Sequence, residues 1–399
     1  MDIMEQKRRY AEVLVIIGLG LKENQSVVIE APVEQYEFAG LVAEQAYKAG
    51  ADSVHVLWKY GVLDRIRLEH DSSQTRNFNQ EFAEYHAERG AGYIRLDTPD
   101  TRLFSGIDAA RLNKKALEDS IVRQVFRKSP RHGGYTIACI PCQSWADMVF
   151  PDIDEAKRVD ALWDAVLTCV RCKEEDPVTS WRNYIADTAK RKEKLNQKQY
   201  KAFHYKSQKT DLLISPVDNN KWQGGCIEYE DSNRVFIPNI PTEEVFTIPH
   251  RYKVNGYVAS TLPLNYRGQL IEEFVLHFKD GRITDFSAQK GEDLLKAIIE
   301  TDEGSHYIGE MALVDQKSPI AGLNRVFYTT LYDENASCHI AIGSSNSGPF
   351  KTTAENREAG YNDSVLHVDF MVGSDNMDIM GQLSDGTWEN IMTNGRWSI

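Results

Sequence analysis

Three short segments between Gly309 and Gly373 combine β-type composition with titratable side chains: GEMALV (309–314), YDENASCHIAIG (332–343) and LHVDFMVG (366–373). In them Glu310, His339, His367 and Asp369 lie in or beside apolar runs, where carboxylates and imidazoles are costly to bury. His367 and Asp369 are two residues apart, so on a strand both side chains project from the same face. The segments therefore suggest a metal-binding wall on a sheet. For the pair alone, the structural alternative is two hydrogen-bonded polar groups in the core.

A further polar element lies upstream, in PNIPTEEVFTIPH (238–250), where Glu243 and Glu244 stand between proline-marked turns. The apolar residues that follow indicate that one of these glutamates points inward. The resulting set of candidate metal ligands is Glu244, Glu310, His339, His367 and Asp369. Carboxylates and imidazoles in this number suit two divalent ions that share a bridging carboxylate and keep room for water.

Two chemistries fit these residue types. Two metals about 3.5–4 Å apart lower the pKa of a bridging water and polarise a carbonyl oxygen, which serves hydrolysis of an amide or a phosphate ester. A mononuclear iron site needs only two histidines and one carboxylate, so His339, His367 and Asp369 alone could form a facial triad. The residues by themselves leave both alternatives open.

The composition indicates a globular protein and argues against nucleic acid and membrane as partners. The chain has 399 residues, enough for two or three domains or for one elaborate α/β body with a second domain. Its 42% apolar and 26% charged residues are ordinary for a globular protein. A formal net charge of −13 argues against nucleic acid as a partner, because phosphate binding needs clustered Lys and Arg. No run approaches 18 apolar residues, so no membrane span is expected. The apolar N-terminal run is interrupted by Glu12 and predicts an amphipathic helix rather than a signal peptide, which favours a cytoplasmic protein.

Six cysteines include two Cys-x-x-Cys pairs, Cys139/Cys142 and Cys169/Cys172. The gap between the pairs exceeds that of zinc ribbons, and neither pair has a glycine-containing knuckle. The first pair closes an apolar strand and the second falls on a predicted helix. Reduced, mostly buried thiols are therefore the favoured interpretation over a structural zinc.

The order of the predicted elements indicates an α/β fold. A strand at 25–30, a helix at 34–49 and a strand at 53–58 form a βαβ unit, which begins a parallel sheet. Strands at 92–96 and 135–140 continue it. The only Gly-x-Gly, at Gly18–Gly20, follows a helix and lacks a third glycine, so a dinucleotide site is not supported.

The pattern of apolar residues changes after a long charged helix predicted at 178–198. From residue 202 alternating apolar segments separated by Gly and Asn turns predict an antiparallel or mixed sheet. We therefore expect an N-terminal parallel-sheet α/β domain over residues 1–195. A β-rich α+β domain over residues 196–399 would hold the metal site.

Several segments also resemble a known family. PNIPTEEVFTIPHRYKVNG (238–256), ETDEG (300–304), GEMALV, DENASCHIAIG and LHVDFMVG are similar to the signature segments of the thermophilic aminopeptidase T / aminopeptidase S family of metallopeptidases. The likeness extends over nearly the whole chain. The resemblance implies the same five ligands, two divalent cations (Zn, Co, Mn or Mg), release of N-terminal residues from peptides, and a homodimer. Glu310 and Asn346 are the candidate catalytic residues.

One position departs from the family pattern. The family usually has a tyrosine seven residues after the histidine of the ENASCH segment, and in this sequence that position is Asn346. An amide can donate a hydrogen bond to an oxyanion, but it is shorter than tyrosine and is not acidic. Two alternatives to a peptidase follow. One is an iron-dependent ring-cleaving dioxygenase on the same scaffold, acting on a small molecule, and the other is a metal-containing protein without catalytic activity.

Overall fold

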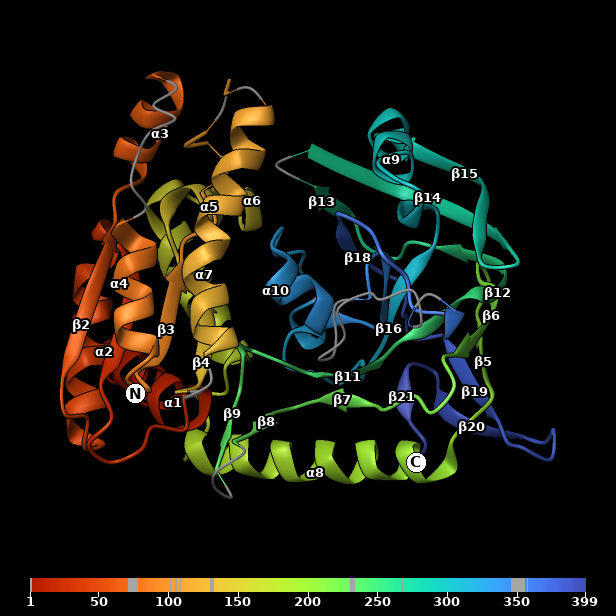
Figure 1. The fold of residues 1–399 in the computed structure, drawn as a ribbon, viewed down its shortest axis with the longest axis horizontal. Helices are drawn as coiled ribbons and strands as arrows, with labels where there is room; N and C mark the ends of the chain where they lie inside the picture. The colour runs from red at the N-terminus through yellow and green to blue at the C-terminus, as the bar shows by residue number, and fades with distance from the viewer. Residues whose placement is uncertain are drawn as a thin grey trace. The chain divides into compact units, whose positions relative to one another are not determined.

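The computed structural model describes residues 2–70, 78–100, 102–104, 106–107, 109–129, 133–229, 234–266, 269–345, 356 and 358–399. By their contacts the residues form two compact units (Figure 1). Unit 1 comprises 1–184 and 226–241, and unit 2 comprises 185–225 and 242–399. This division differs from the expected single boundary after residue 195 in two ways. The boundary falls after residue 184, inside the helix Pro177–Lys198, and the later segment 226–241 belongs to unit 1. None of the helices in the described ranges is long and apolar enough to cross a membrane.

Unit 1 is a parallel α/β structure, as expected. Its helices and turns are α1 (Ile3–Val13), η1 (Leu14–Gly18), η2 (Val33–Gln35), α2 (Tyr36–Lys48), α3 (Gly61–His70), α4 (Phe78–Ala87), α5 (Ala109–Lys128), α6 (Gln143–Val149) and α7 (Glu155–Cys169). Its strands are β1 (Val27–Pro32), β2 (Val54–Lys59), β3 (Gly92–Asp97), β4 (Tyr135–Cys139) and β10 (Asn239–Ile240), with the small pair β8 (Ile227–Glu228) and β9 (Val235–Phe236). The sheet order is β10-β4-β3-β1-β2, and all four pairings are parallel.

Helices cover both faces of this sheet. On one face α4 and α5 pack against the row formed by Val28, Tyr93 and Tyr135, and Phe126 of α5 stacks on Tyr93 with ring centroids 4.6 Å apart. Elsewhere α1, α2 and α7 join through the rings of Tyr10, Phe38 and Trp163. A parallel sheet needs such double cover because its strands are apolar on both sides.

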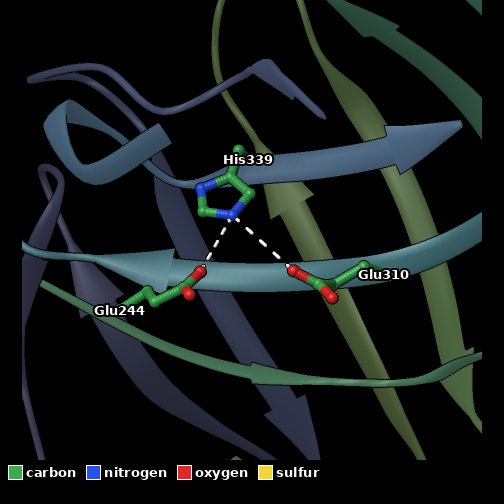
Figure 2. A group of neighbouring side chains, drawn as sticks. All are labelled: Glu244, Glu310 and His339. Atoms are coloured by element: carbon green, nitrogen blue, oxygen red, sulfur yellow. Dashed lines mark ion pairs between the residues drawn. The ribbon is translucent and has the colours of Figure 1, made fainter. Parts of the chain in front are cut away.

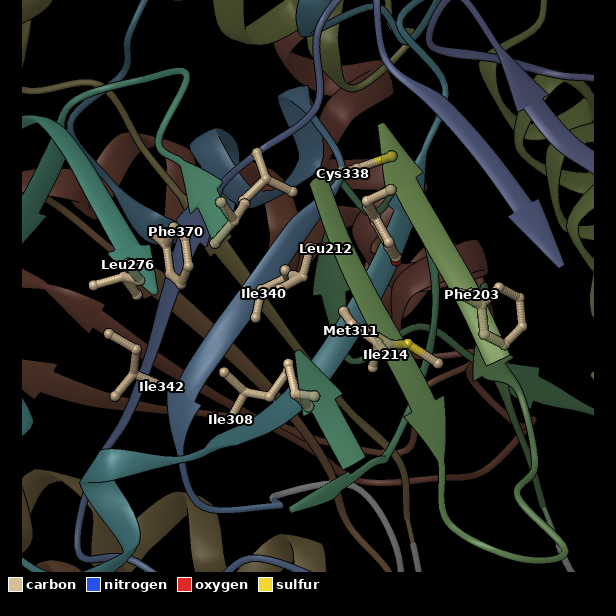
Figure 3. Packing of buried hydrophobic residues seen from close by; sticks show 14 of the residues in the cluster. Phe203, Leu212, Ile214, Leu276, Ile308, Met311, Cys338, Ile340, Ile342 and Phe370 are labelled. Carbon is tan, nitrogen blue, oxygen red and sulfur yellow. The ribbon is translucent and has the colours of Figure 1, made fainter. Parts of the chain in front are cut away.

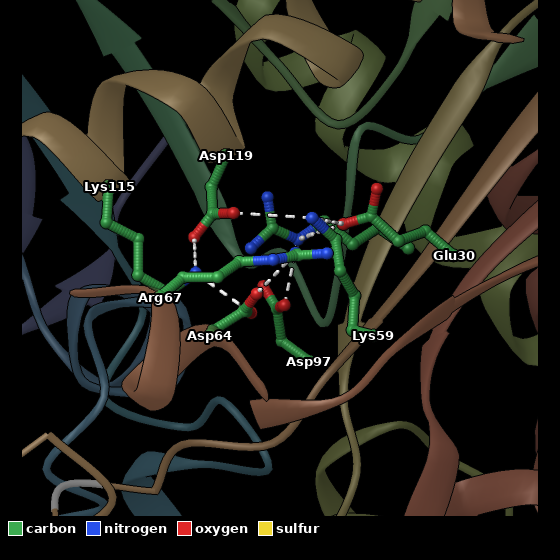
Figure 4. A network of polar contacts seen from close by, with 8 residues as sticks. Glu30, Lys59, Asp64, Arg67, Asp97, Lys115 and Asp119 are labelled. Carbon is green, nitrogen blue, oxygen red and sulfur yellow. Dashed lines mark hydrogen bonds and ion pairs between the residues drawn. The ribbon is translucent and has the colours of Figure 1, made fainter. Parts of the chain in front are cut away.

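A network of charged side chains lies toward the carboxyl ends of β1, β2 and β3 (Figure 4). Glu30 is 2% exposed, and its Oε1 lies 3.7 Å from Arg95 Nε and 3.9 Å from Lys59 Nζ. Shorter contacts join Arg95 to Asp97 at 2.8 Å and Lys59 to Asp119 at 3.3 Å. The cations thus have closer partners than Glu30. Burial raises the pKa of Glu30, although Lys59 and Arg95 lower it.

Replacing Glu30 with glutamine is expected to leave the protein at least as stable above pH 6. A carboxyl group whose pKa is raised on folding stabilises the fold while protonated, and that contribution declines as the pH rises from the unfolded value toward the folded value. The stability of Glu30→Gln relative to the wild type should therefore increase with pH, and urea unfolding at pH 5, 6, 7 and 8 measures it. Glu34→Gln, at an exposed position, is the control. A variant less stable than the wild type at pH 8 would contradict this reading.

Unit 2 is rich in β structure. Its helices and turns are most of α8 (Pro177–Lys198), then α9 (Glu292–Ile299), η3 (Gly304–His306), η4 (Ala321–Leu323), α10 (Thr330–Asp333) and η5 (Glu334–Ala336). One sheet has the order β18-β17-β16-β11-β7, formed by β7 (Gln223–Gly224), β11 (Glu244–Thr247), β16 (Ile308–Val314), β17 (His339–Gly343) and β18 (His367–Met371). The other contains β5 (Ala202–Lys206), β6 (Asp211–Pro216), β12 (Pro249–Ala259), β13 (Leu264–Tyr266), β14 (Gln269–Lys279), β15 (Arg282–Lys290), β19 (Asp378–Gln382), β20 (Trp388–Thr393) and β21 (Arg396–Trp397).

The core of unit 2 joins its two sheets (Figure 3). Ile340 and Phe370 come from the five-stranded sheet, while Phe203, Leu212 and Leu276 come from the nine-stranded one. All five are fully buried. Each sheet therefore keeps one face in this core, and the five-stranded sheet has its opposite face available for other groups.

Candidate metal centre

Strand alternation places all five predicted ligands on one face of the five-stranded sheet. The side chains on the opposite face are apolar and belong to the core: Val245, Met311, Leu313, Ile340, Ile342, Val368 and Phe370. Each ligand is an odd number of residues from its core neighbours on the same strand, so its side chain points the other way. The strands that carry the ligands, β11, β16, β17 and β18, are consecutive in the sheet. Four adjacent strands therefore bring the five candidate ligands to one face of the sheet, where metal binding stays a prediction.

A β-bulge sets the direction of Glu310. The register between β16 and β17 shifts between Ile308 and Glu310, so that Ile308 pairs with Ile342 and Glu310 with Ala341. The extra residue is Gly309. It lets Ile308 enter the core while Glu310, two residues later, reaches the opposite face.

Ala341 separates two of the ligands. It pairs with Glu310 on one side and with Asp369 on the other, and its small side chain leaves the space above it to the two carboxylates.

The first group of candidate ligands is Glu244, Glu310 and His339 (Figure 2). His339 Nε2 lies 3.0 Å from Glu244 Oε2 and 3.8 Å from Glu310 Oε1. The side chain of His339 is 1% exposed, and those of the two glutamates are 14% and 10% exposed. One imidazole nitrogen thus faces two shielded carboxylates from neighbouring strands.

The second group is Glu310, His367 and Asp369. His367 Nε2 lies 3.3 Å from Asp369 Oδ1 and 4.0 Å from Glu310 Oε2. In each group the possible ligand atoms all lie within 4.8 Å of one another. Glu310 belongs to both groups and presents a different oxygen to each histidine, so it has the position expected of a bridging carboxylate.

Both imidazoles are oriented through their second nitrogen. His339 Nδ1 is 3.2 Å from the carbonyl oxygen of Ser337, and His367 Nδ1 is 2.7 Å from that of Ser344. A carbonyl oxygen only accepts, so Nδ1 carries the hydrogen in both rings. This arrangement leaves Nε2 as the atom directed at the carboxylates, and it is the usual support of a metal-binding histidine.

The electrostatics of the face favour positive charge. Burial would lower the pKa of His339, but hydrogen bonds to Glu244 and Glu310 raise it well above its ordinary value. Burial also acts to lower the pKa of His367, but Asp369 and Glu310 raise it to about 10. Protein groups alone therefore balance the carboxylates by holding protons on both imidazoles. A cluster of oxygen and imidazole donors that attracts protons this strongly fits divalent cations.

Comparison with known proteins identifies the family. The family model described as thermophilic metalloprotease (M29) matches residues 4–397. The chain belongs to the M29 metalloprotease family.

Curated relatives of this M29 chain cover its whole length. Aminopeptidase AmpS of Bacillus subtilis is 37% identical and covers 100% of both chains. Aminopeptidase 2 of Geobacillus stearothermophilus is 35% identical, covering 98% of this chain and 97% of the relative. The structure titled wild-type AmpT from Thermus thermophilus superposes with a TM-score of 0.91 at 31% identity, over 100% of both chains. The family, the α/β fold class and the enzyme class of metallo-aminopeptidase, a hydrolase, are thereby confirmed.

The M29 site contains one carboxylate that the sequence reasoning missed. Glu334 lies in the turn η5, five residues before His339. Burial raises its pKa well above the ordinary value, and the charges of Asp369 and Glu244 raise it further. Because Glu334 lies in a turn, strand periodicity could not single it out. The available signal was the polar run Asp333-Glu334-Asn335 shortly before the buried strand β17.

The sequence also raised a facial triad, the two cysteine pairs and Asn346 as candidates for metal binding or catalysis. The facial triad of His339, His367 and Asp369 is not one of the two groups of described residues that could hold a metal ion, because the two histidines face different carboxylates. Neither group includes a cysteine, and Cys139, Cys169 and Cys172 are buried thiols. Asn346 lies outside the described residues.

Asn335 connects two ligand-bearing segments of the M29 site. It is 1% exposed, and its Oδ1 accepts a hydrogen bond of 2.6 Å from the backbone N–H of Glu243, the residue before Glu244. Its Nδ2 donates to the carbonyl oxygen of Leu331 at 2.9 Å and lies 3.4 Å from Glu334 Oε1. The amide thus ties the start of β11 to the turn that carries Glu334.

Replacing Asn335 with alanine is expected to weaken metal binding and to lower the free energy of unfolding by about 1–3 kcal/mol, because a buried N–H loses its acceptor. Asn335→Asp should not restore binding, since it places an acceptor against the Leu331 carbonyl and the Glu334 carboxylate. Calorimetric metal titration and urea unfolding measure the two effects. Asn390→Ala, at an exposed position on β20, is the control. Wild-type metal affinity in Asn335→Ala would show that Asn335 does not position the ligands.

Proposed function

We propose that this chain releases N-terminal residues from peptides and that two divalent ions, held by Glu244, Glu310, His339, His367 and Asp369, support the reaction. The proposal rests on the position of Glu310, which belongs to both groups of candidate ligands. One of its carboxylate oxygens faces His339 and the other faces His367. A single ion would leave one of these groups without a cation. Zn, Co, Mn and Mg are the candidate ions.

The charge of the cluster supports two cations rather than one. Glu244, Glu310, Glu334 and Asp369 offer four carboxylates, which match the charge of two divalent ions. An ionised carboxylate without a partner is costly in a shielded space. If only one divalent ion were bound, some of these four carboxyl groups would therefore have to stay protonated. The raised pKa values of Glu310 and Glu334, caused first by burial, agree with this reasoning.

Bound divalent ions supply a water of lowered pKa and polarise the carbonyl oxygen of the substrate. The protein groups have separate tasks. His339 and His367 keep Nε2 directed inward through their Nδ1–H bonds, and Glu310 fixes the spacing between the two groups of ligands. The acidic surroundings favour a substrate with a protonated or metal-binding free amine, which accounts for action at the amino terminus.

The test is hydrolysis of a panel of dipeptides, each with a free and with an N-acetylated amine, after chelator treatment and return of Zn, Co, Mn or Fe(II). We expect metal-dependent release of the first residue from free-amine substrates only. Metal analysis of the reconstituted protein should give two ions per chain. Absence of turnover with every metal would overturn the proposal and direct attention to Asn346. The homodimer, the cytoplasmic location and a catalytic role of Asn346 stay predictions from the sequence.

A further inference from the structure

The strand that carries His367 and Asp369 is at the edge of its sheet. The sheet order is β18-β17-β16-β11-β7, so β18 has a paired side toward β17 and an outer side. We propose that the outer side of β18 binds the main chain of the peptide substrate as an additional strand. This inference rests on the proposed function and adds the way in which the substrate is held.

The direction of the backbone groups of β18 follows from its bonds. Val372 N–H donates to Cys338 O at 2.8 Å, and Ser344 N–H donates to Leu366 O at 2.8 Å. In an antiparallel pair such bonding residues alternate with residues whose N–H and C=O point away from the partner. Leu366, Val368, Phe370 and Val372 therefore bond to β17, while the groups of His367, Asp369 and Met371 point outward.

One end of this outer edge is already closed. The outward carbonyl of Met371 accepts a hydrogen bond of 2.9 Å from the N–H of Thr261. The bond confirms the outward direction of the odd-numbered residues, and it marks where the free edge ends.

The outward groups of His367 and Asp369 have no backbone partner within the described part of the chain. The N–H of Asp369 also interacts with its own carboxylate, which leaves the two carbonyls and the N–H of His367 as the open groups. Unpaired groups on an edge strand are a template for another extended chain, and peptides are commonly recognised by this kind of strand addition.

The position of the edge suits an exopeptidase. The backbone groups belong to the same residues whose side chains face the site, so an added strand lies beside the ligand cluster. The closed end at Met371 would stop the peptide, so the amino terminus belongs there and the remainder runs toward His367. The peptide is then antiparallel to β18 and spans two or three residues beyond the cleaved bond. Main-chain binding of this kind does not depend on the substrate side chains.

An N-methyl scan of a free-amine pentapeptide of alanine tests the proposal. Hydrolysis of the parent peptide establishes the proposed function first. In an extended strand successive N–H groups point to opposite sides, so N-methylation at one of residues 3 and 4 should raise KM at least tenfold and at the other less than twofold. Equal effects at both residues, or none at either, would overturn strand addition while leaving the peptidase activity established.

Amide hydrogen exchange tests binding without turnover. A peptide whose first amide is replaced by a reduced, uncleavable bond should slow exchange at the N–H of His367, the open donor of this edge. Val368 and Phe370 should not change, because they already bond to β17, and the edge strand β15 of the other sheet is an internal control. Failure of the peptide to slow exchange at His367 would overturn the proposal even if dipeptides are cleaved.

Discussion

Replacing Glu310 with alanine is expected to abolish peptide hydrolysis. Glu310 is the only described residue common to both ligand groups, so its removal weakens both at once. We expect kcat/KM to fall at least ~1,000-fold, which corresponds to roughly 4 kcal/mol of transition-state stabilisation. Metal analysis should show fewer than two ions per chain. The metal-free variant should remain folded, because burial already disfavours the charged form of this carboxyl group and raises its pKa.

The same variant separates the chemistries that the residues alone left open. A mononuclear iron site built from His339, His367 and Asp369 would survive the loss of Glu310, whereas a site bridged by Glu310 would not. Glu300→Ala, at an exposed glutamate of the same unit, is the matched control and should keep full activity. Glu310→Ala with two tightly held ions and unchanged kcat/KM would refute the bridging role.

Replacing Phe370 with alanine is expected to lower the free energy of unfolding by about 3–5 kcal/mol, the usual cost of a cavity left by a buried phenylalanine. The ring of Phe370 is fully buried in the core of unit 2 (Figure 3). Its centroid lies 5.2 Å from that of Phe274 on the opposing sheet. Phe370 is adjacent in sequence to Asp369, and its anchoring holds β18 with the ligand face outward. We therefore expect weaker metal binding as well as lower stability.

Urea unfolding of the metal-free protein and metal titration separate these two effects of Phe370→Ala. Phe370→Leu keeps most of the apolar contact and should show a smaller loss in both measurements. Loss of stability with unchanged metal affinity would mean that β18 holds its ligands without the core anchor.

The sequence predicted the elements of unit 1 well, because a βαβ pattern with strong hydrophobic periodicity depends on local residues. The expected helix at 34–49 is observed as η2 and α2, and the expected strand at 53–58 as β2. By contrast, β10 consists of two residues that follow a long excursion of the chain, and no local pattern marks them as part of the parallel sheet. Pairing of distant segments is decided by tertiary packing, which periodicity does not report.

For the site, the period of two in LHVDFM was sufficient to place His367 and Asp369 on one face. The bulge at Gly309 could not be inferred, since a one-residue shift becomes visible only when the partner strand is known. Glu334 was missed for a related reason, because its turn approaches the ligands through the fold and not through a repeated spacing. The sequence thus predicted which residues share a strand face more readily than how the strands are aligned.

The return of residues 226–241 to unit 1 bears on how the protein is synthesised. Tyr229 donates to the carbonyl oxygens of Leu19 at 2.7 Å and Gly133 at 2.9 Å, and β10 pairs with β4. While the ribosome is still translating the region before residue 226, unit 1 lacks this strand and the two aromatic residues that complete its core, Tyr229 and Phe236. The nascent N-terminal half therefore has an open sheet edge at β4 until well over half of the chain has been made. Chaperone binding to ribosome-bound chains should accordingly decline only once residue 241 has left the exit tunnel.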